Sequence, residues 1–154
     1  MADVHEGGCL CGAVRYRVEG EPILAGVCRC TRCKRMSGSA FVIATYFAEE
    51  AVQITGALNN YECRSDESNR RLKSEFCPSC GTTVTWTAEL LPSARGIAGG
   101  TFDDPNWIKP AVHGWTRSAL HWMVFPSGVE IFRTTNPDWQ MPPNRLLDKR
   151  SNEL

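Results

Sequence analysis

Apolar and polar residues alternate over several short stretches of the chain. In one of them, Val14, Tyr16 and Val18 would point inward while Arg15 and Arg17 point toward water, which is the period of a half-buried β-strand. Similar runs, rich in β-branched and aromatic residues, recur along the sequence. Together they predict strands at 13–18, 23–27, 41–47, 52–54, 71–76, 82–87, 97–101, 111–115 and 129–133.

Turn-forming residues separate these runs. They include a Gly-Glu-Pro at 20–22, Gly56, the polar segment 65–69, an Asp-Asp-Pro-Asn at 103–106 and a Pro-Ser-Gly at 126–128. Helical periodicity is weak, and short helical turns are expected only after Cys30 and around 117–121. The fold class predicted is therefore mainly β, built from short antiparallel strands.

The length of 154 residues fits one domain with a substantial core. From residue 136 the composition becomes polar and contains Pro137, Pro142 and Pro143. We therefore predict one domain over 1–135, followed by a C-terminal tail over 136–154 that packs on the domain or frays from it.

The charge balance argues against a polyanionic partner. Lys and Arg number 17 against 17 for Asp and Glu, so the chain lacks the basic footprint of a nucleic-acid or anionic-membrane binder. Its first six residues do not form a secretory signal, and no apolar run reaches the length of a membrane span. A reducing cytoplasm is expected, where eight cysteines favour metal binding or catalysis over disulfides.

Seven of the eight cysteines occur in three close groups, and Cys63 stands alone. Thiolates that surround zinc come as close pairs on tight turns, joined from two parts of the chain. The Cys-Pro-Ser-Cys turn ends at Gly81, which can take a left-handed conformation that turns backbone amides toward the sulfurs. Its natural complement is the other two-membered group, so the sequence predicts a closed structural zinc site of four thiolates: Cys9, Cys11, Cys77 and Cys80.

The middle group then holds three cysteines within six residues: Cys28, Cys30 and Cys33. Three protein ligands and one open position form the catalytic arrangement of zinc, and we predict that these residues carry zinc-mediated catalysis. The alternative is a second structural site, closed by a fourth protein ligand among Cys63, His5, His113 and His121. The cofactor prediction is two zinc ions per chain.

Basic and hydroxyl side chains next to the middle group are candidates for substrate binding, since guanidinium and ammonium groups hold the carboxylates of small acidic molecules. The alternative is surface charge that balances the thiolates. A further pair of carboxylates, Asp103 and Asp104, is either catalytic or part of an ordinary turn. The predicted substrate contacts are Arg29, Lys34, Arg35, Ser37 and Ser39.

Three segments of the chain resemble the glutathione-dependent formaldehyde-activating enzyme (GFA) family, which also includes centromere protein V. They run from Gly7 to Tyr16, from Cys28 to Phe41 and from Phe76 to Gly81, and the segment from Gly99 to Asp104 is similar as well. The resemblance covers roughly residues 7 to 125. Arg29 departs from it, because the family often has His at that place.

The resemblance implies a mainly β fold with two zinc sites, the four-cysteine site structural and the three-cysteine site active. It also implies a carbon–sulfur lyase similar to S-(hydroxymethyl)glutathione synthase, with glutathione or a similar thiol adduct as the partner. Two other functions stay open at this point. One is a zinc-stabilised module whose basic residues at 29–35 bind a protein or nucleic acid, and the other is a thiol redox or metal-sensing protein that uses Cys63.

Overall fold

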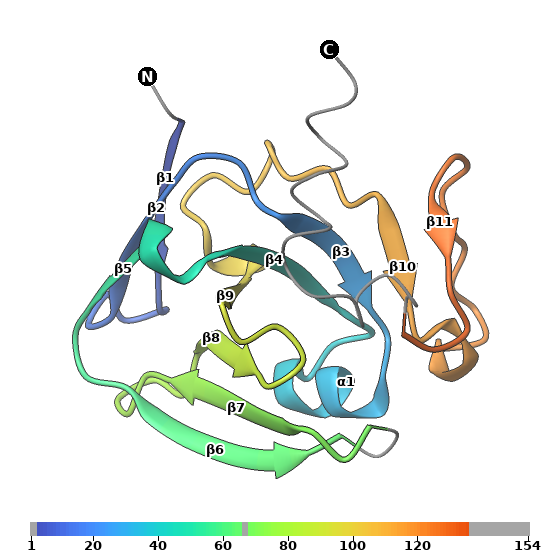
Figure 1. Ribbon diagram of the computed structural model, residues 1–154, viewed down its shortest axis with the longest axis horizontal. Helices are drawn as coiled ribbons and strands as arrows, with labels where there is room; N and C mark the ends of the chain where they lie inside the picture. The colour runs from blue at the N-terminus through green and yellow to red at the C-terminus, as the bar shows by residue number, and fades with distance from the viewer. Residues whose placement is uncertain (1–2, 66–67, 136–154) are drawn as a thin grey trace.

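Short strands form two sheets in the computed structural model of the protein, which describes residues 3–65 and 68–135 (Figure 1). The tail predicted at 136–154 lies outside the described residues. The elements, in chain order, are β1 (Val4–Gly8), β2 (Arg15–Glu19), β3 (Leu24–Cys28), α1 (Thr31–Ser37), β4 (Val42–Ala48), η1 (Glu49–Ala51), β5 (Val52–Thr55), β6 (Asn59–Arg64), β7 (Arg71–Phe76), β8 (Thr83–Ala88), β9 (Ala94–Ala98), η2 (Gly99–Thr101), β10 (Val112–Gly114), η3 (Thr116–Ser118) and β11 (Glu130–Ile131).

The smaller sheet has the strand order β1-β2-β5, and the larger has the order β11-β10-β3-β4-β9-β8-β7-β6. The mainly β prediction is confirmed, and most neighbours are antiparallel. The strand β10 departs from that rule, since it pairs in parallel with both β3 and β11. Among the described residues, no helix is long and apolar enough to cross a membrane.

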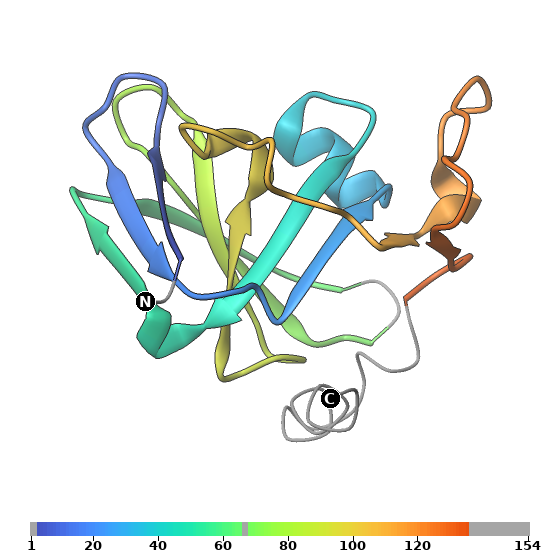
Figure 2. The same ribbon diagram turned by 90° about the horizontal axis from the view of Figure 1, so that it is seen from above.

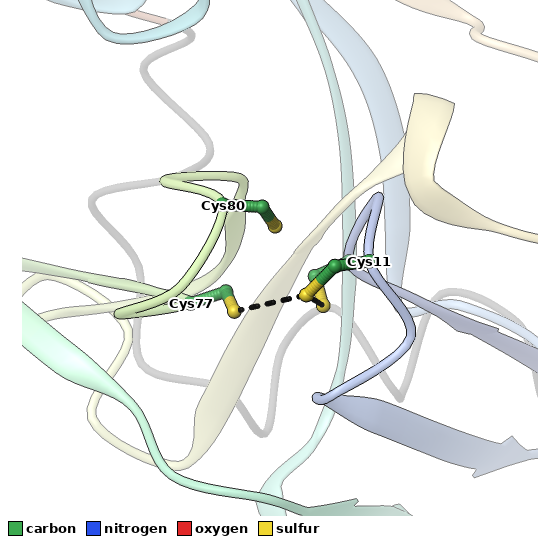
Figure 3. Close-up of side chains that lie close together, drawn as sticks. Cys11, Cys77 and Cys80 are labelled. Atoms are coloured by element: carbon green, nitrogen blue, oxygen red, sulfur yellow. Dashed lines mark hydrogen bonds between the residues drawn. The ribbon is translucent and has the colours of Figure 1, made fainter.

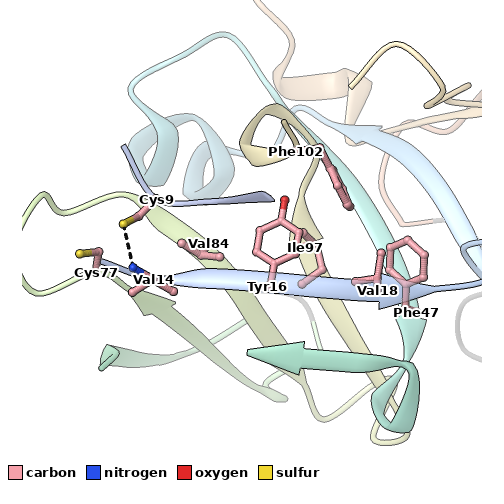
Figure 4. Packing of buried hydrophobic residues seen from close by; sticks show 9 residues of the cluster. All are labelled: Cys9, Val14, Tyr16, Val18, Phe47, Cys77, Val84, Ile97 and Phe102. Carbon is pink, nitrogen blue, oxygen red and sulfur yellow. Dashed lines mark hydrogen bonds between the residues drawn. The ribbon is translucent and has the colours of Figure 1, made fainter. Parts of the chain in front are cut away.

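The main core lies where the smaller sheet covers the centre of the larger one (Figure 4). The alternation in β2 and just before it holds as predicted, since Val14, Tyr16 and Val18 are buried and Arg15 and Arg17 are half-exposed. Burying such side chains is the dominant favourable contribution to folding. They pack with Phe47, Val84, Ile97 and Phe102.

Two strands have no counterpart in the predicted set, β1 and β6. In β1, Gly7 and Gly8 conceal the alternation; Gly7 is required because a Cβ there would lie 2.3 Å from the Tyr16 hydroxyl and 2.4 Å from the Thr101 carbonyl. In β6, an edge strand, almost every residue is exposed and polar. The strand predicted at 97–101 instead ends at Ala98 and continues as η2.

The loops that contain the candidate functional residues lie along one edge of the molecule. Seen from above, the loop between β1 and β2, the loop between β7 and β8, η2 and α1 all lie along this edge (Figure 2). The helix α1 is the helical turn predicted after Cys30, and it ends at Gly38, whose left-handed φ of 64° closes the last turn.

Candidate metal centres

Four cysteine sulfurs meet where the β1–β2 loop approaches the β7–β8 loop (Figure 3). The Sγ atom of Cys11 lies 3.6 Å from that of Cys9 and 3.7 Å from that of Cys77, and all four sulfurs, including Cys80, are within 4.8 Å of one another. A zinc ion with bonds of about 2.3 Å to four sulfurs separates them by about 3.8 Å. The residues therefore fit zinc in number, chemistry and spacing.

Tight turns bring these sulfurs into position. Gly81 has the expected left-handed conformation, with φ of 73°, and its N–H donates to the carbonyl of Cys77 over 2.9 Å. Thr82 braces the two loops, because its Oγ1 accepts from the N–H of Leu10 and lies 3.2 Å from the Cys80 sulfur. Hydrogen bonds from the Thr82 hydroxyl and N–H lower the pKa of Cys80 to about 5, so this thiol is readily available as a ligand.

The other three sulfurs gather at a junction between a strand and a helix. Cys28 is the last residue of β3, Cys30 is the N-cap of α1, and Cys33 lies in the first helical turn. The N–H of Cys33 donates to the Cys30 sulfur over 3.2 Å, which is the ordinary capping interaction made here by a thiol. The three sulfurs lie within 4.8 Å of one another, and all three residues are half-buried.

Close contact makes one of these thiols far more acidic than the others. Hydrogen bonds from the thiols of Cys28 and Cys33 lower the pKa of Cys30 to about 3, against the opposing effect of burial. For the same reason the pKa of Cys28 rises to about 12, because its thiol donates to Cys30. The group thus resists carrying three negative charges by itself, and a divalent cation would supply the compensating charge.

The fourth ligands considered from the sequence lie elsewhere. Among residues 3–65 and 68–135, no other Cys, His, Asp or Glu belongs to the three-sulfur group. Cys63 accepts from Arg32 Nε over 3.2 Å. His5 stacks on a tryptophan ring with centroids 3.8 Å apart, His113 is bonded to Arg29, and His121 is exposed in a turn. The three-sulfur group therefore has no fourth protein ligand among the residues that the structure describes.

Arg29 lies inside the protein. Only 2% of its surface is exposed, and its Nη1 donates to Nδ1 of His113 over 2.9 Å. The guanidinium carbon lies 4.7 Å from the ring centroid of Phe125 and 5.3 Å from that of Phe41. Burial lowers the pKa of Arg29, opposed by the neighbouring Cys28. The side chain holds β3, β10 and the start of β4 together, a role that the local sequence pattern does not indicate.

Two more basic side chains of this segment are engaged within the protein. Lys34 donates to the carbonyl of Ser118, and Arg32 donates to both Cys63 and Ser74. Arg35 is exposed at the end of α1. The basic residues of the segment 29–35 therefore lie in three different environments: Arg29 is in the core, Arg32 and Lys34 are hydrogen-bonded within the protein, and Arg35 is exposed.

Comparison with known families adds to this geometry. The family model of the glutathione-dependent formaldehyde-activating enzyme, GFA, matches residues 4–118 of the chain. The chain belongs to the GFA family. The matched segment contains both sulfur groups.

A solved structure is similar to this GFA-family chain. It is the crystal structure of a Rhodobacter sphaeroides protein, with 23% sequence identity and a TM-score of 0.49, and the match covers 82% of this chain and 98% of that one.

The hydroxyls predicted for substrate binding in this GFA-family chain sit at the end of α1. Ser37 donates to the carbonyl of Cys33 over 2.8 Å and accepts from the N–H of Ser39, and both residues are exposed.

The contacts of the two adjacent carboxylates, Asp103 and Asp104, favour the turn interpretation over a catalytic one. Asp103 forms a two-pronged ion pair with Arg15, and Asp104 accepts from the N–H of Asn106 over 3.0 Å.

A cleft of about 460 Å³ in this GFA-family chain lies beside Cys80 of the four-sulfur group and extends to Met36 and Ser37 of α1, the helix that carries Cys33. Sequence reasoning did not predict it, although Ser37 and the Gly-Gly-Thr of η2 were among the residues it singled out. Its walls come from α1, the start of β4, the β7–β8 loop and η2. The lining residues are Met36, Ser37, Phe41, Val42, Ile43, Cys80, Gly81, Thr82, Thr83, Ala98, Gly99, Gly100 and Thr101.

Proposed function

We propose that this GFA-family protein is a zinc-dependent carbon–sulfur lyase that acts on a small thiol or its aldehyde adduct, with glutathione as the reference thiol. The observation that carries the proposal is the open three-sulfur group of Cys28, Cys30 and Cys33, which is half-buried and has no fourth candidate ligand among the described residues. The four-sulfur group would hold a second, structural zinc, so that each chain binds two ions.

The reaction is an addition across a carbonyl group. The sulfur of the thiol forms a bond to the carbonyl carbon, the C=O double bond becomes a single bond, and the thiol proton ends on the oxygen. In the reverse direction the C–S bond breaks and the aldehyde and thiol are released. Zinc held by three thiolates favours the deprotonated, nucleophilic form of an incoming thiol.

The protein's own residues supply position and access. Cys28 is held on both sides, by β4 at Val42 and by β10 at Gly114, and Cys30 is held by the N–H of Cys33. Such preorganised ligands need little rearrangement when a substrate arrives. Ser37, Ser39 and Arg35 lie at the exposed end of α1, the helix that carries Cys33, and remain our candidates for contacts with the polar parts of the substrate.

A binding module for a protein or nucleic acid has less support. Three of its four basic residues are engaged internally, Arg29 in the core, Arg32 with Cys63 and Lys34 with Ser118. A redox function through Cys63 would need a sulfur partner, and Cys63 lies instead against a guanidinium. We place the protein in the cytoplasm, because none of the eight cysteines forms a disulfide.

Zinc content and turnover test the proposal together. Elemental analysis is expected to give two zinc ions per wild-type chain and one for Cys30→Ser. The rate of S-hydroxymethyl adduct formation, followed by exchange NMR with ¹³C-formaldehyde and glutathione, is expected to exceed the uncatalysed rate for wild type and to fall to that rate for Cys30→Ser. Cys63→Ser is the matched control and should keep both properties. A wild-type protein with two zinc ions and no rate above background for any small thiol would contradict the proposal.

A further inference from the structure

The cleft beside Cys80 is connected to the three-sulfur group through shared packing. Cys33 packs against a small cluster formed by Val42, Ala44 and Trp86, to which Met36 and Ala98 also belong. Three members of that cluster, Met36, Val42 and Ala98, line the cleft. A molecule bound through sulfur beside Cys33 would therefore lie next to residues that also form the cleft wall. Its volume falls in the usual range for small-molecule sites, about 300–1,000 Å³.

The walls of the cleft carry no positive charge. Apolar side chains alternate with the hydroxyls of Ser37, Thr82, Thr83 and Thr101 and with glycine backbone, and the one ionisable lining residue, Cys80, is a thiolate of the four-sulfur group. Hydroxyls and exposed backbone can exchange hydrogen bonds with an amide, an alcohol or an ether. They cannot compensate a carboxylate for the water it would lose, and that loss costs several kcal/mol for an unpaired ion.

No Lys or Arg is among the residues that line the cleft, and Arg35, beside Met36 on α1, is exposed at the surface. Arg29 is separated from the cleft by the ring of Phe41, on which its guanidinium stacks. Arg15, next to η2, is bonded to Asp103. Neither guanidinium is available to pair with an anion inside the cleft.

We propose that this cleft is a subsite for an uncharged organic group attached to the sulfur of the substrate, so that the protein selects thiols with a neutral substituent over thiols with an anionic one. The inference rests on the proposed function, since it takes the sulfur itself to bind at the three-cysteine site. It predicts that glutathione, whose substituent carries two carboxylates, is a poorer ligand than a neutral thiol of similar size.

Two thiols of nearly equal shape that differ in the charge of the substituent test the proposal. In 3-mercaptopropionamide the substituent is a neutral amide, and in 3-mercaptopropionate it is a carboxylate. Titration calorimetry of the two-zinc protein is expected to show at least about tenfold tighter binding of the amide. Equal binding, or tighter binding of the carboxylate, would overturn the proposal.

Gly100 offers a variant that fills the cleft without disturbing the fold. A Cβ added there meets no atom within 4 Å, and its φ is not in the left-handed region, whereas at neighbouring Gly99 a Cβ would lie 2.5 Å from Ile43. Gly100→Phe is expected to weaken binding of the amide at least tenfold and leave binding of methanethiol unchanged. Ser93→Phe, exposed at the opposite end of β9, is the matched control and should behave as wild type.

Methanethiol separates the two claims. If methanethiol binds but Gly100→Phe leaves the affinity for the amide unchanged, the subsite is wrong and the proposed function stands. If methanethiol fails to bind, the proposed function is wrong. The cleft is then tested alone by NMR, where amide-proton shifts at Thr82 and Thr101 on adding 3-mercaptopropionamide to wild type, absent in Gly100→Phe, support it and their absence in wild type overturns it.

Discussion

Arg29 donates a hydrogen bond to Nδ1 of His113 over 2.9 Å, although 84 residues separate the two in the chain. Both side chains are buried, at 2% and 4% exposure. Because an arginine has only donors, the Nδ1 atom of His113 must be the acceptor, and the neutral imidazole carries its proton on Nε2. The pair thus joins the segment with the three-cysteine group to β10 through one defined protonation state.

Removing the guanidinium is expected to destabilise the fold. Arg29→Met leaves His113 without its donor and removes the group that stacks between Phe41 and Phe125, at a cost of about 2–4 kcal/mol. Urea denaturation of the zinc-loaded protein measures this change. The control is Arg35→Met, an exposed arginine of the same segment, which should stay within about 0.5 kcal/mol of wild type.

Acidification should weaken the same contact. Burial, and then the charge of Arg29, lower the pKa of His113 below its usual value of 6.5. Below pH 6.5 the unfolded chain therefore binds more protons at this residue than the folded protein does. The stability from the neutral imidazole is complete above pH 6.5 and is lost as pH falls toward the folded pKa, by at most about 1.4 kcal/mol per pH unit.

A variant isolates this residue from the other titrating groups. His113→Gln retains an acceptor for Arg29 and cannot be protonated, so its urea-unfolding stability should fall less than that of wild type between pH 7.5 and 5.5. Parallel pH dependences of the two proteins would show that His113 does not titrate in this window.

Gly96 provides a test of packing. It faces Trp86 on β8 and Tyr46 on β4, whose side chains meet through a hydrogen bond of 3.0 Å from Nε1 to the hydroxyl. A Cβ on Gly96 would lie 2.1 Å from Trp86 Nε1. Gly96→Ala is therefore expected to destabilise the fold by about 1–3 kcal/mol, with a change in tryptophan fluorescence, while Gly100→Ala should have little effect on either measurement.

Asp103→Asn tests the turn interpretation of the two adjacent carboxylates. The Arg15 hydrogen bond lowers the pKa of Asp103, against the opposing effect of desolvation, and both partners are substantially exposed. Screening by solvent makes such a pair weak. We expect turnover and the urea midpoint to stay near their wild-type values, and a large loss of turnover with normal zinc content would restore a catalytic role.

The two sulfur groups should differ in their importance for folding. Cys77 is fully buried in the main core, with 0% exposure, next to Val14 and Val84. Cys77→Ser is expected to lower the thermal midpoint severely and to release zinc, because structural zinc contributes directly to folding free energy. Cys30→Ser should keep a cooperative unfolding transition. Equal midpoints for the two variants would contradict this division of roles.

The grouping of the cysteine sulfurs could be predicted from the sequence, because ligands that share a tight turn must be close together in the chain. The strand at 71–76 and the inward positions of β2 were also predictable, since alternation exposes them. The strand β1 was not, because Gly7 is required there by the approach of Tyr16 and Thr101, contacts made by residues distant in sequence.

At the candidate site, Arg29 illustrates the same limit of prediction from sequence. An arginine among other basic residues is normally expected at the surface, and its burial depends on Phe125 and His113, which a local pattern cannot bring near. The cleft likewise needs four segments to be assembled before it exists. Properties set by one turn of chain were predictable, and those set by long-range packing were not.

The parallel pairing of β10 with β3 imposes an order on biosynthesis. The four-sulfur group has all its ligands once residue 80 has left the ribosome, whereas the outer side of Cys28 has no partner strand until Gly114 follows. A nascent chain stalled between these two points would hold the sealed zinc site and still leave the edge of its reactive strand uncovered. Length-dependent zinc capture by arrested chains would reveal two separate steps along a single growing polypeptide.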